Sequence, residues 1–166
     1  PVVNRAAKRF IPVAEPSIGK REVKAVAEVV ESGWISQGQV VNEFEQIFAN
    51  FHDTKYGSAC TSGTTALHLA LAVCDISRGD EVIIPDFTMV ALANATLLSG
   101  GTPVFADVVG GVGNLSLDCI KEKITDKTTV VIVVHTYGEP IDDIVEISKY
   151  LNKRGIFLIE DCAESH

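Results

Sequence analysis

The amino-acid sequence predicts an α/β fold built on a mostly parallel sheet with helices on both faces. Five short apolar runs alternate with segments in which apolar residues recur at helical spacing. The expected strands are residues 56–60, 81–84, 103–106, 129–134 and 156–160. The expected helices between and around them are residues 64–75, 87–98, 117–124 and 140–153. Because the apolar runs are nearly continuous, we expect strands covered on both faces, as in parallel sheets joined by crossover helices.

The chain before this alternating pattern predicts an arm and two helices. Residues 1–16 are expected to be an irregular arm, because each proline disfavours helical backbone in the residue before it. Residues 17–166 are then expected to form the main domain. Ser17 is expected to cap a first amphipathic helix that stops at Gly33, and residues 40–51 predict a second one.

Composition and charge exclude several classes of protein. The net charge of −8 argues against a general nucleic-acid surface and an anionic-membrane surface, because both need a basic face. No apolar run approaches the roughly 18 residues that span a bilayer, and no signal peptide is visible. The four cysteines are widely spaced and form no metal-type cluster, which is typical of reduced thiols. We therefore expect no bound metal ion, no membrane segment and a cytoplasmic location.

The most informative stretch is Ser62-Gly63-Thr64, which stands between an expected strand and an expected helix. The first N–H groups of a helix lack intrahelical partners, and the helix dipole favours negative charge there, so the stretch predicts a phosphate site. Taken alone, such a stretch is more often a simple helix cap. The other expected strand ends add polar residues, and in a parallel sheet they share one edge. These ends are Pro85–Met89, Asp107, His135–Gly138 and Glu160–His166.

A phosphate site and a strand-end carboxylate at one sheet edge are one way to hold pyridoxal phosphate (PLP). The pyridine nitrogen of this cofactor needs an acid partner, so that the ring stays protonated and accepts electrons. Asp161, at the end of the last expected strand, is the candidate for that partner. His135 also stands at a strand end, where it either contacts a substrate or serves as a satisfied structural histidine.

Six blocks of sequence carry a family resemblance. They are Gly33–Gly38, Ser62–Leu67, Gly79–Pro85, Thr102–Asp107, Tyr137–Gly138 and Glu160–His166. Together these blocks resemble the DegT/DnrJ/EryC1/StrS aminotransferases, enzymes that make amino sugars on nucleotide-linked hexoses. The resemblance runs from about Ile11 to His166, and the blocks stand in the family's order and spacing.

The resemblance implies roles for individual residues. The residues implied to bind the cofactor are Ser62, Gly63, Thr64, Met89, Asp161 and Glu164. The first three would hold the phosphate, Asp161 would pair with the pyridine nitrogen, and Glu164 would lie beside the ring hydroxyl. Met89 would cover the ring face as a soft apolar side chain, where the family often has an aromatic residue. The residues implied near the sugar substrate are Trp34, Ile35 and Ser36, with His135 as a further candidate.

The resemblance also implies the fold and the reaction of the intact protein. The implied fold is the large domain of type I PLP-dependent transferases, in which the expected strands run in the order fifth, fourth, second, third. The implied reaction is amination of a nucleotide-linked ketohexose for polysaccharide or lipopolysaccharide synthesis, with glutamate as the amino donor. A perosamine-type 4-aminotransferase is the expected subgroup, and a homodimer is the expected assembly. A related dehydratase, in which histidine replaces the catalytic lysine, stays open as an alternative.

The Schiff-base lysine of the family falls beyond His166, as do the strands that would separate the first expected strand from the others. The sequence is therefore expected to be the N-terminal portion of a larger enzyme, completed by a C-terminal portion. An inactive fragment that binds phosphorylated ligands, or that serves as an assembly module, is the alternative from another class. A nicotinamide-dependent oxidoreductase is a third, although Gly110–Gly113 lacks the flanking strand and helix of a dinucleotide fingerprint.

Overall fold

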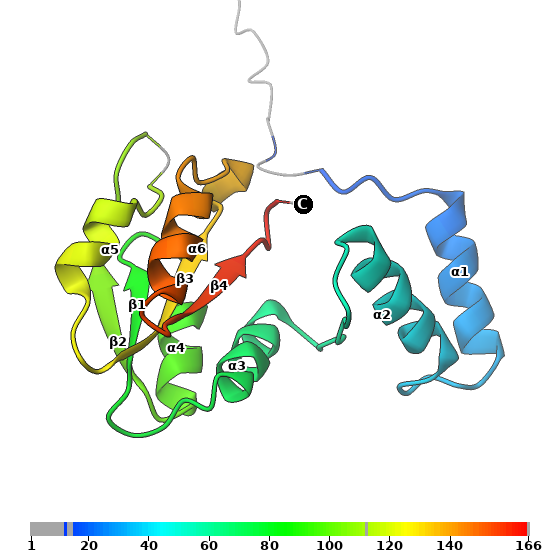
Figure 1. The fold of residues 1–166 in the computed structure, drawn as a ribbon. Helices are drawn as coiled ribbons and strands as arrows, with labels where there is room; N and C mark the ends of the chain where they lie inside the picture. The colour runs from blue at the N-terminus through cyan, green and yellow to red at the C-terminus, as the bar shows by residue number, and fades with distance from the viewer. Residues whose placement is uncertain (1–11, 13–14, 112, 166) are drawn as a thin grey trace, which may run out of the picture. The chain divides into compact units, whose positions relative to one another are not determined.

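The structure is a computed structural model that describes residues 12, 15–111 and 113–165 of the chain. It divides into two compact units, Pro1–Ser58 and Ala59–His166, and each is described by itself (Figure 1). The arm expected over residues 1–16 lies largely outside the described residues.

The first unit contains two helices, α1 (Lys20–Glu31) and α2 (Gln39–Phe51), in its described part. The expectation that Ser17 caps the first helix is wrong, because the N-cap of α1 is Gly19. The carboxylate of Glu22 accepts a hydrogen bond from the backbone N–H of Gly19 at 2.7 Å. Glu22 is the third residue of α1, and its carboxylate gives the Gly19 N–H a partner, so a capping hydroxyl is not needed.

The second unit is built on one parallel sheet. Its strands in the described part of the chain are β1 (Glu81–Pro85), β2 (Thr102–Ala106), β3 (Thr128–Val134) and β4 (Phe157–Asp161). They run side by side in the order β2-β1-β3-β4, and every neighbouring pair is parallel. This order confirms the α/β fold and the implied succession of the last four expected strands.

The first expected strand, residues 56–60, is wrong, because the structure shows no strand there. A strand forms only where its backbone pairs with a neighbour, and the four strands of the described sheet pair with one another. The boundary between the two units also falls inside this segment, after Ser58. The segment 56–60 therefore has no neighbouring strand to pair with in the described part of the chain.

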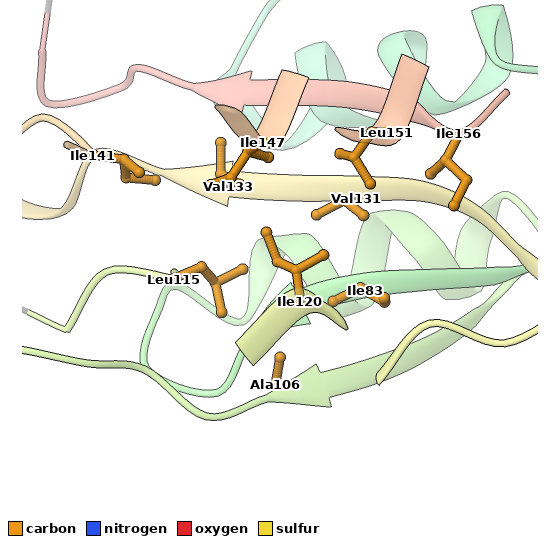
Figure 2. Packing of buried hydrophobic residues seen from close by; sticks show 10 residues of the cluster. All are labelled: Ile83, Ala106, Leu115, Ile120, Val131, Val133, Ile141, Ile147, Leu151 and Ile156. Atoms are coloured by element: carbon orange, nitrogen blue, oxygen red, sulfur yellow. The ribbon is translucent and has the colours of Figure 1, made fainter. Parts of the chain in front are cut away.

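Alternate side chains of the central strands point to opposite faces of the sheet. On one face, Ile83, Val131 and Val133 pack against α5 (Leu117–Lys123) and α6 (Ile144–Asn152) (Figure 2). On the other face, the buried cluster combines alternate residues of β1 and β3 with residues of α3 (Gly63–Val73) and α4 (Ala91–Leu98). This second cluster includes Leu67, Leu71, Val82, Ile84, Leu92, Val130 and Ile132. The prediction of helices on both faces is confirmed.

Two helices begin later than the sequence pattern predicts, and the difference shapes the site. The helix expected from residue 87 begins at Ala91, and the helix expected from residue 140 begins at Ile144. The residues in front of each helix instead form loops that follow β1 and β3. The loop after β3 opens with a short turn, η1 (Thr136–Gly138). These loops lie where the strands end, which is where parallel sheets place their ligands.

Asp80 joins the turn before β1 to β3 and supports a prediction about stability. Its carboxylate accepts hydrogen bonds from the backbone and side chain of Ser77, at 2.9 and 3.0 Å, and from Thr129 Oγ1 at 3.0 Å. These bonds, first those from Ser77 and then that from Thr129, lower the pKa of Asp80. We expect Asp80→Asn to lower the free energy of unfolding at pH 7, because it weakens these hydrogen bonds. The loss should be only about 1 kcal/mol, because the carboxylate is partly exposed to solvent.

The pH dependence of this loss has a definite sign. Because folding lowers the pKa of Asp80, its stabilisation is fully present above the ordinary value of about 3.9. It is lost as the pH falls through the lower pKa of the folded state. The stabilities of the wild type and Asp80→Asn should therefore approach each other at acid pH. Urea unfolding of both proteins at pH 7 and at acid pH measures this. The exposed Asp126→Asn is the matched control, and an equal loss in both variants would refute the prediction.

Candidate functional site

A cavity of about 400 Å³ opens at the carboxyl ends of three strands in the second unit. Its walls come from the segments that follow β1 and β3 and from the end of β4. The lining residues are Asp86–Met89, Val134, Thr136, Tyr137, Asp161, Ala163 and Glu164. The strands β3 and β4 stop together, because Val134 pairs with Asp161 in the sheet register. Residues far apart in the sequence therefore meet at one edge, as the strand-end pattern predicts.

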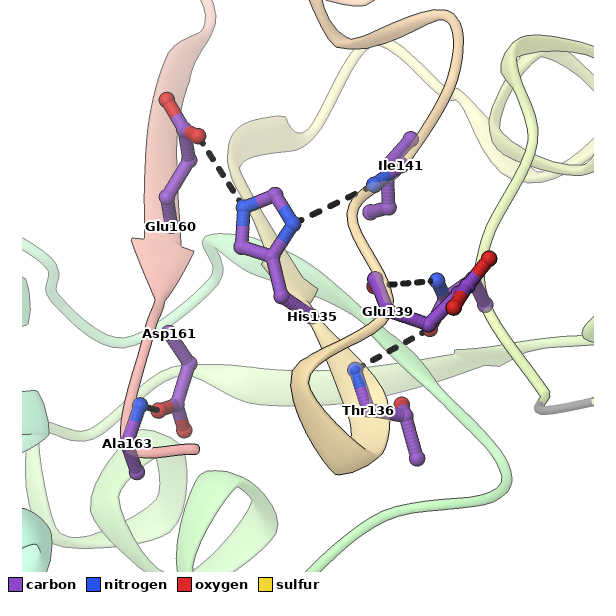
Figure 3. A network of polar contacts seen from close by, with 8 residues as sticks. His135, Thr136, Glu139, Ile141, Glu160, Asp161 and Ala163 are labelled. Atoms are coloured by element: carbon purple, nitrogen blue, oxygen red, sulfur yellow. Dashed lines mark hydrogen bonds and ion pairs between the residues drawn. The ribbon is translucent and has the colours of Figure 1, made fainter. Parts of the chain in front are cut away.

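Asp161 is the last residue of β4 and presents its carboxylate to this cavity. Oδ1 accepts a hydrogen bond from the backbone N–H of Ala163 at 3.0 Å, which holds the side chain in place (Figure 3). Within the described part of the chain, the other carboxylate oxygen, Oδ2, has no hydrogen-bond partner. One carboxylate oxygen is therefore held in place and the other is available. The available oxygen can accept a hydrogen bond from a ligand or pair with a cation.

Glu164 and the turn η1 are joined by a hydrogen bond in the cavity wall. Glu164 Oε2 accepts a hydrogen bond from the backbone N–H of Tyr137 at 2.8 Å. Tyr137 and Gly138 both have positive φ, at 55° and 81°, and a Cβ on Gly138 would lie 3.0 Å from the Glu164 carbonyl oxygen. Only glycine fits both the left-handed backbone and this close approach. The turn therefore holds Tyr137 and Glu164 in one arrangement.

Apolar side chains form the remaining wall. Met89 lines the cavity and is 72% exposed, so it stands at the rim. The ring of Phe87 lies 6.5 Å from that of Tyr137, at an interplanar angle of 66°. Such edge-to-face pairs are favourable, and both rings line the cavity. Phe87 and Tyr137 were not singled out as site residues from the sequence, although both follow apolar strands.

His135 is buried and is not among the residues that line the cavity. Its Nδ1 accepts a hydrogen bond from the backbone N–H of Ile141 at 3.2 Å, so the ring proton of the neutral imidazole is on Nε2 (Figure 3). Nε2 lies 3.2 Å from the Glu160 carboxylate, to which it donates. Both ring nitrogens are engaged and the side chain is buried, which is the arrangement of a structural histidine.

Asn114 is a positioning residue that sequence analysis missed. Its Oδ1 accepts a hydrogen bond from the backbone N–H of Thr136 at 3.1 Å. Its Nδ2 donates to the carbonyl oxygen of Glu139 at 2.9 Å. The side chain is buried and so braces both ends of the loop that carries Tyr137. The only sequence signal was a polar residue at the edge of a glycine-rich loop, which does not reveal a long-range partner.

The start of α3 carries two free donors. Ser62 is the N-cap; its Oγ accepts from the Thr65 N–H at 3.3 Å, and its own N–H donates to Thr65 Oγ1 at 3.0 Å. Among the described residues, the N–H groups of Gly63 and Thr64 have no hydrogen-bond partner. A Cβ on Gly63 would meet no atom within 4 Å. Open space and two N–H groups at a helix start suit an anion, although these residues do not line the cavity.

Trp34, Ile35 and Ser36 lie in the first unit, in the loop between α1 and α2. The side chain of Trp34 is 66% exposed, and its Nε1 donates to the carbonyl oxygen of Gln37 at 3.0 Å. A Cβ on Gly38 would meet the indole ring, so a larger residue there would force the Trp34 side chain to shift. The loop therefore presents a fixed aromatic surface within its own unit.

The described residues contain neither a metal-type cluster nor a membrane-spanning helix. No group of three or more histidine, cysteine, aspartate or glutamate side chains there is placed to hold a metal ion. Nor does any helix in the described ranges have the length and apolar content needed to cross a membrane.

The sequence matches known proteins along nearly its whole length. A model of the DegT/DnrJ/EryC1/StrS aminotransferase family matches residues 16–166. A GDP-perosamine synthase from Escherichia coli O157:H7 is 42% identical over 160 residues, which are 95% of this chain and 43% of that protein. The spore coat polysaccharide biosynthesis protein SpsC from Bacillus subtilis is 38% identical over 156 residues, which are 94% of this chain and 40% of that protein.

Solved structures share the fold. An aminotransferase from Psychrobacter cryohalolentis has a TM-score of 0.86 and 38% identity, covering 93% of this chain and 40% of that one. A GDP-4-keto-6-deoxymannose-3-dehydratase with a trapped PLP–glutamate geminal diamine has a TM-score of 0.85 and 29% identity. The match covers 94% of this chain and 42% of that one. The chain therefore spans less than half the length of the relatives that it matches.

Proposed function

Because the chain belongs to the DegT/DnrJ/EryC1/StrS aminotransferase family, we propose that it forms part of an enzyme that aminates a nucleotide-linked ketohexose. The proposed substrate is a GDP-linked 4-keto sugar of the perosamine type, because a relative named GDP-perosamine synthase is 42% identical to the chain. The proposed amino donor is glutamate, which is trapped with PLP in one solved relative. The family cofactor is pyridoxal phosphate, which supplies a protonated pyridine ring that accepts electrons during amino-group transfer.

The observation that carries the proposal is the carboxylate of Asp161 at the end of β4. It lines a cavity of about 400 Å³ and keeps one oxygen without a partner among the described residues. A carboxylate placed in this way would hold the proton on the pyridine nitrogen, since an adjacent negative charge favours the protonated form of a base. The acceptor, the cavity and the apolar wall of Phe87 and Met89 together fit a flat, protonated ring.

Other residues of the chain would bind and orient the cofactor and the sugar. The N–H groups of Gly63 and Thr64 at the start of α3 would hold the phosphate, with the Thr64 hydroxyl as a further donor. Glu164, fixed by Tyr137, would lie beside the ring hydroxyl. Trp34, Ile35 and Ser36 would form part of the sugar site, and His135 would support the loop that lines the cavity.

The proposal extends to assembly and location. The relatives are more than twice as long as this chain, so we propose that a C-terminal portion supplies the Schiff-base lysine and that the intact enzyme is a homodimer. All four cysteines are free thiols in the structure. Free thiols persist in reducing compartments, which supports the cytoplasm as the proposed location.

Product analysis tests the proposed reaction. The protein that contains this chain is incubated with PLP, glutamate and GDP-4-keto-6-deoxymannose, and the nucleotide sugars are identified by mass spectrometry. We expect a GDP-linked 4-amino sugar whose nitrogen derives from ¹⁵N-labelled glutamate. A 3-deoxy sugar would instead indicate the dehydratase alternative. Cofactor binding without any change in the sugar would favour the phosphate-ligand-binding or assembly module.

A further inference from the structure

The hydroxyl of Thr136 stands out among the buried polar groups. The residue is only 6% exposed, and its Oγ1 is the one buried side-chain polar atom in the described part of the chain that has no hydrogen-bond partner. Burying a hydroxyl without a partner is unfavourable, so such atoms are uncommon and call for a physical reason. A group that arrives from outside the chain is one such reason.

Thr136 belongs to the wall of the cavity. Thr136 is one of the lining residues, and it follows directly on the strand end that pairs with Asp161. Its backbone N–H is held by Asn114 Oδ1 at 3.1 Å, and the next residue, Tyr137, is held by Glu164. The branched side chain has few rotamers, and the backbone on either side of it is fixed. The unpartnered oxygen is therefore held in a defined place within the wall of the cavity.

The charge of the cavity indicates what this hydroxyl would bind. The charged side chains in the lining are the carboxylates Asp86, Asp161 and Glu164. An ionised carboxylate accepts hydrogen bonds but cannot donate them. A ligand oxygen that accepts a hydrogen bond would therefore need a neutral donor here. Thr136 is the fully buried hydroxyl of the lining, since Thr88 and Tyr137 are more exposed.

We propose that Thr136 Oγ1 is a cofactor-binding group that donates a hydrogen bond to the ring oxygen of the pyridoxal cofactor. The inference rests on the proposed function, which places that cofactor in this cavity. Asp161 would then act on the ring nitrogen and Thr136 on the ring oxygen. The hydroxyl that has no partner in the chain would gain one from the ligand.

The test compares Thr136→Val, which removes the hydroxyl and keeps the shape, with Thr136→Ser, which keeps the hydroxyl. The probe is pyridoxamine 5′-phosphate, whose amine cannot form Schiff bases with surface lysines, and calorimetry measures its Kd. We expect Thr136→Val to raise the Kd about tenfold and Thr136→Ser to leave it within about threefold of the wild type. With a 3-deoxy analogue of the probe, we expect the wild type and Thr136→Val to bind equally.

Unfolding of the ligand-free protein provides a second readout. Removing an unpartnered hydroxyl breaks no bond, so we expect Thr136→Val to be at least as stable as the wild type without ligand. A destabilised ligand-free variant would show that the hydroxyl has a structural partner and would overturn the inference. Equal affinity of the wild type and Thr136→Val for the probe would also overturn it. Failure of the wild type to bind the probe would instead refute the proposed function.

Discussion

Replacing Asp161 with alanine is expected to weaken binding of pyridoxamine 5′-phosphate about 10- to 100-fold. A hydrogen bond to a charged group contributes about 1.5–3 kcal/mol, and the variant removes the carboxylate that would hold the ring nitrogen. The loss of turnover in the intact enzyme is expected to be larger, because an unprotonated ring accepts electrons poorly. Calorimetry measures the affinity, and the rate of amino-sugar formation measures the turnover.

Two further variants make this prediction specific. Asp161→Asn keeps the shape of the side chain but removes the negative charge, so we expect it to bind the probe almost as weakly as alanine does. Asp107→Asn is the matched control, because Asp107 also follows a strand, β2, but is exposed and does not line the cavity. Equal affinities for all three variants and the wild type would show that Asp161 does not contact the cofactor.

Asn114→Ala is expected to cost about 2–4 kcal/mol of stability. The substitution removes both hydrogen bonds of the buried side chain, and it leaves the N–H of Thr136 and the carbonyl of Glu139 without that partner. Because these groups lie at the two ends of the loop that carries Tyr137, the loop should loosen and the affinity for pyridoxamine 5′-phosphate should fall as well. Urea unfolding and calorimetry on one preparation measure both effects.

The exposed Asn152, at the end of α6, gives a control of the same chemistry. We expect Asn152→Ala to change stability by no more than about 0.5 kcal/mol, as exposed substitutions generally do. If Asn114→Ala were as mild as this control, Asn114 would not brace the loop. If it lowered stability without affecting ligand affinity, the loop would not position the lining residues.

The sequence predicts those parts of the fold that depend on local pattern. The apolar runs within β1 and β3 are nearly continuous, because strands covered on both faces need apolar residues at successive positions. The segment 56–60 was also expected to be a strand, but whether it pairs depends on distant chain, which no local pattern encodes. The starts of α4 and α6 differ from the prediction because loops at the strand ends take up the residues in front of them.

The same distinction explains what was predicted of the site. Asp161, Glu164 and Met89 were expected from their positions after strands and from the family resemblance, and the structure brings all three to one cavity. Asn114 was missed, because its importance comes from burial and from partners more than twenty residues away, and Thr136 was expected only as part of the strand end 135–138. A polar residue in a loop gives no sign of such partners until the chain has folded.

The protonation state of the bound ring tests the central claim, that Asp161 pairs with the pyridine nitrogen of the cofactor, most directly. Pyridoxamine 5′-phosphate labelled with ¹⁵N in the ring is bound to the wild type and to Asp161→Asn, and its ¹⁵N chemical shift is followed against pH. A neighbouring carboxylate raises the pKa of the ring nitrogen, so we expect the nitrogen to stay protonated to a higher pH in the wild type than in free cofactor. We expect Asp161→Asn to abolish that difference. A wild-type complex that loses the proton at the same pH as its Asp161→Asn counterpart would contradict the claim.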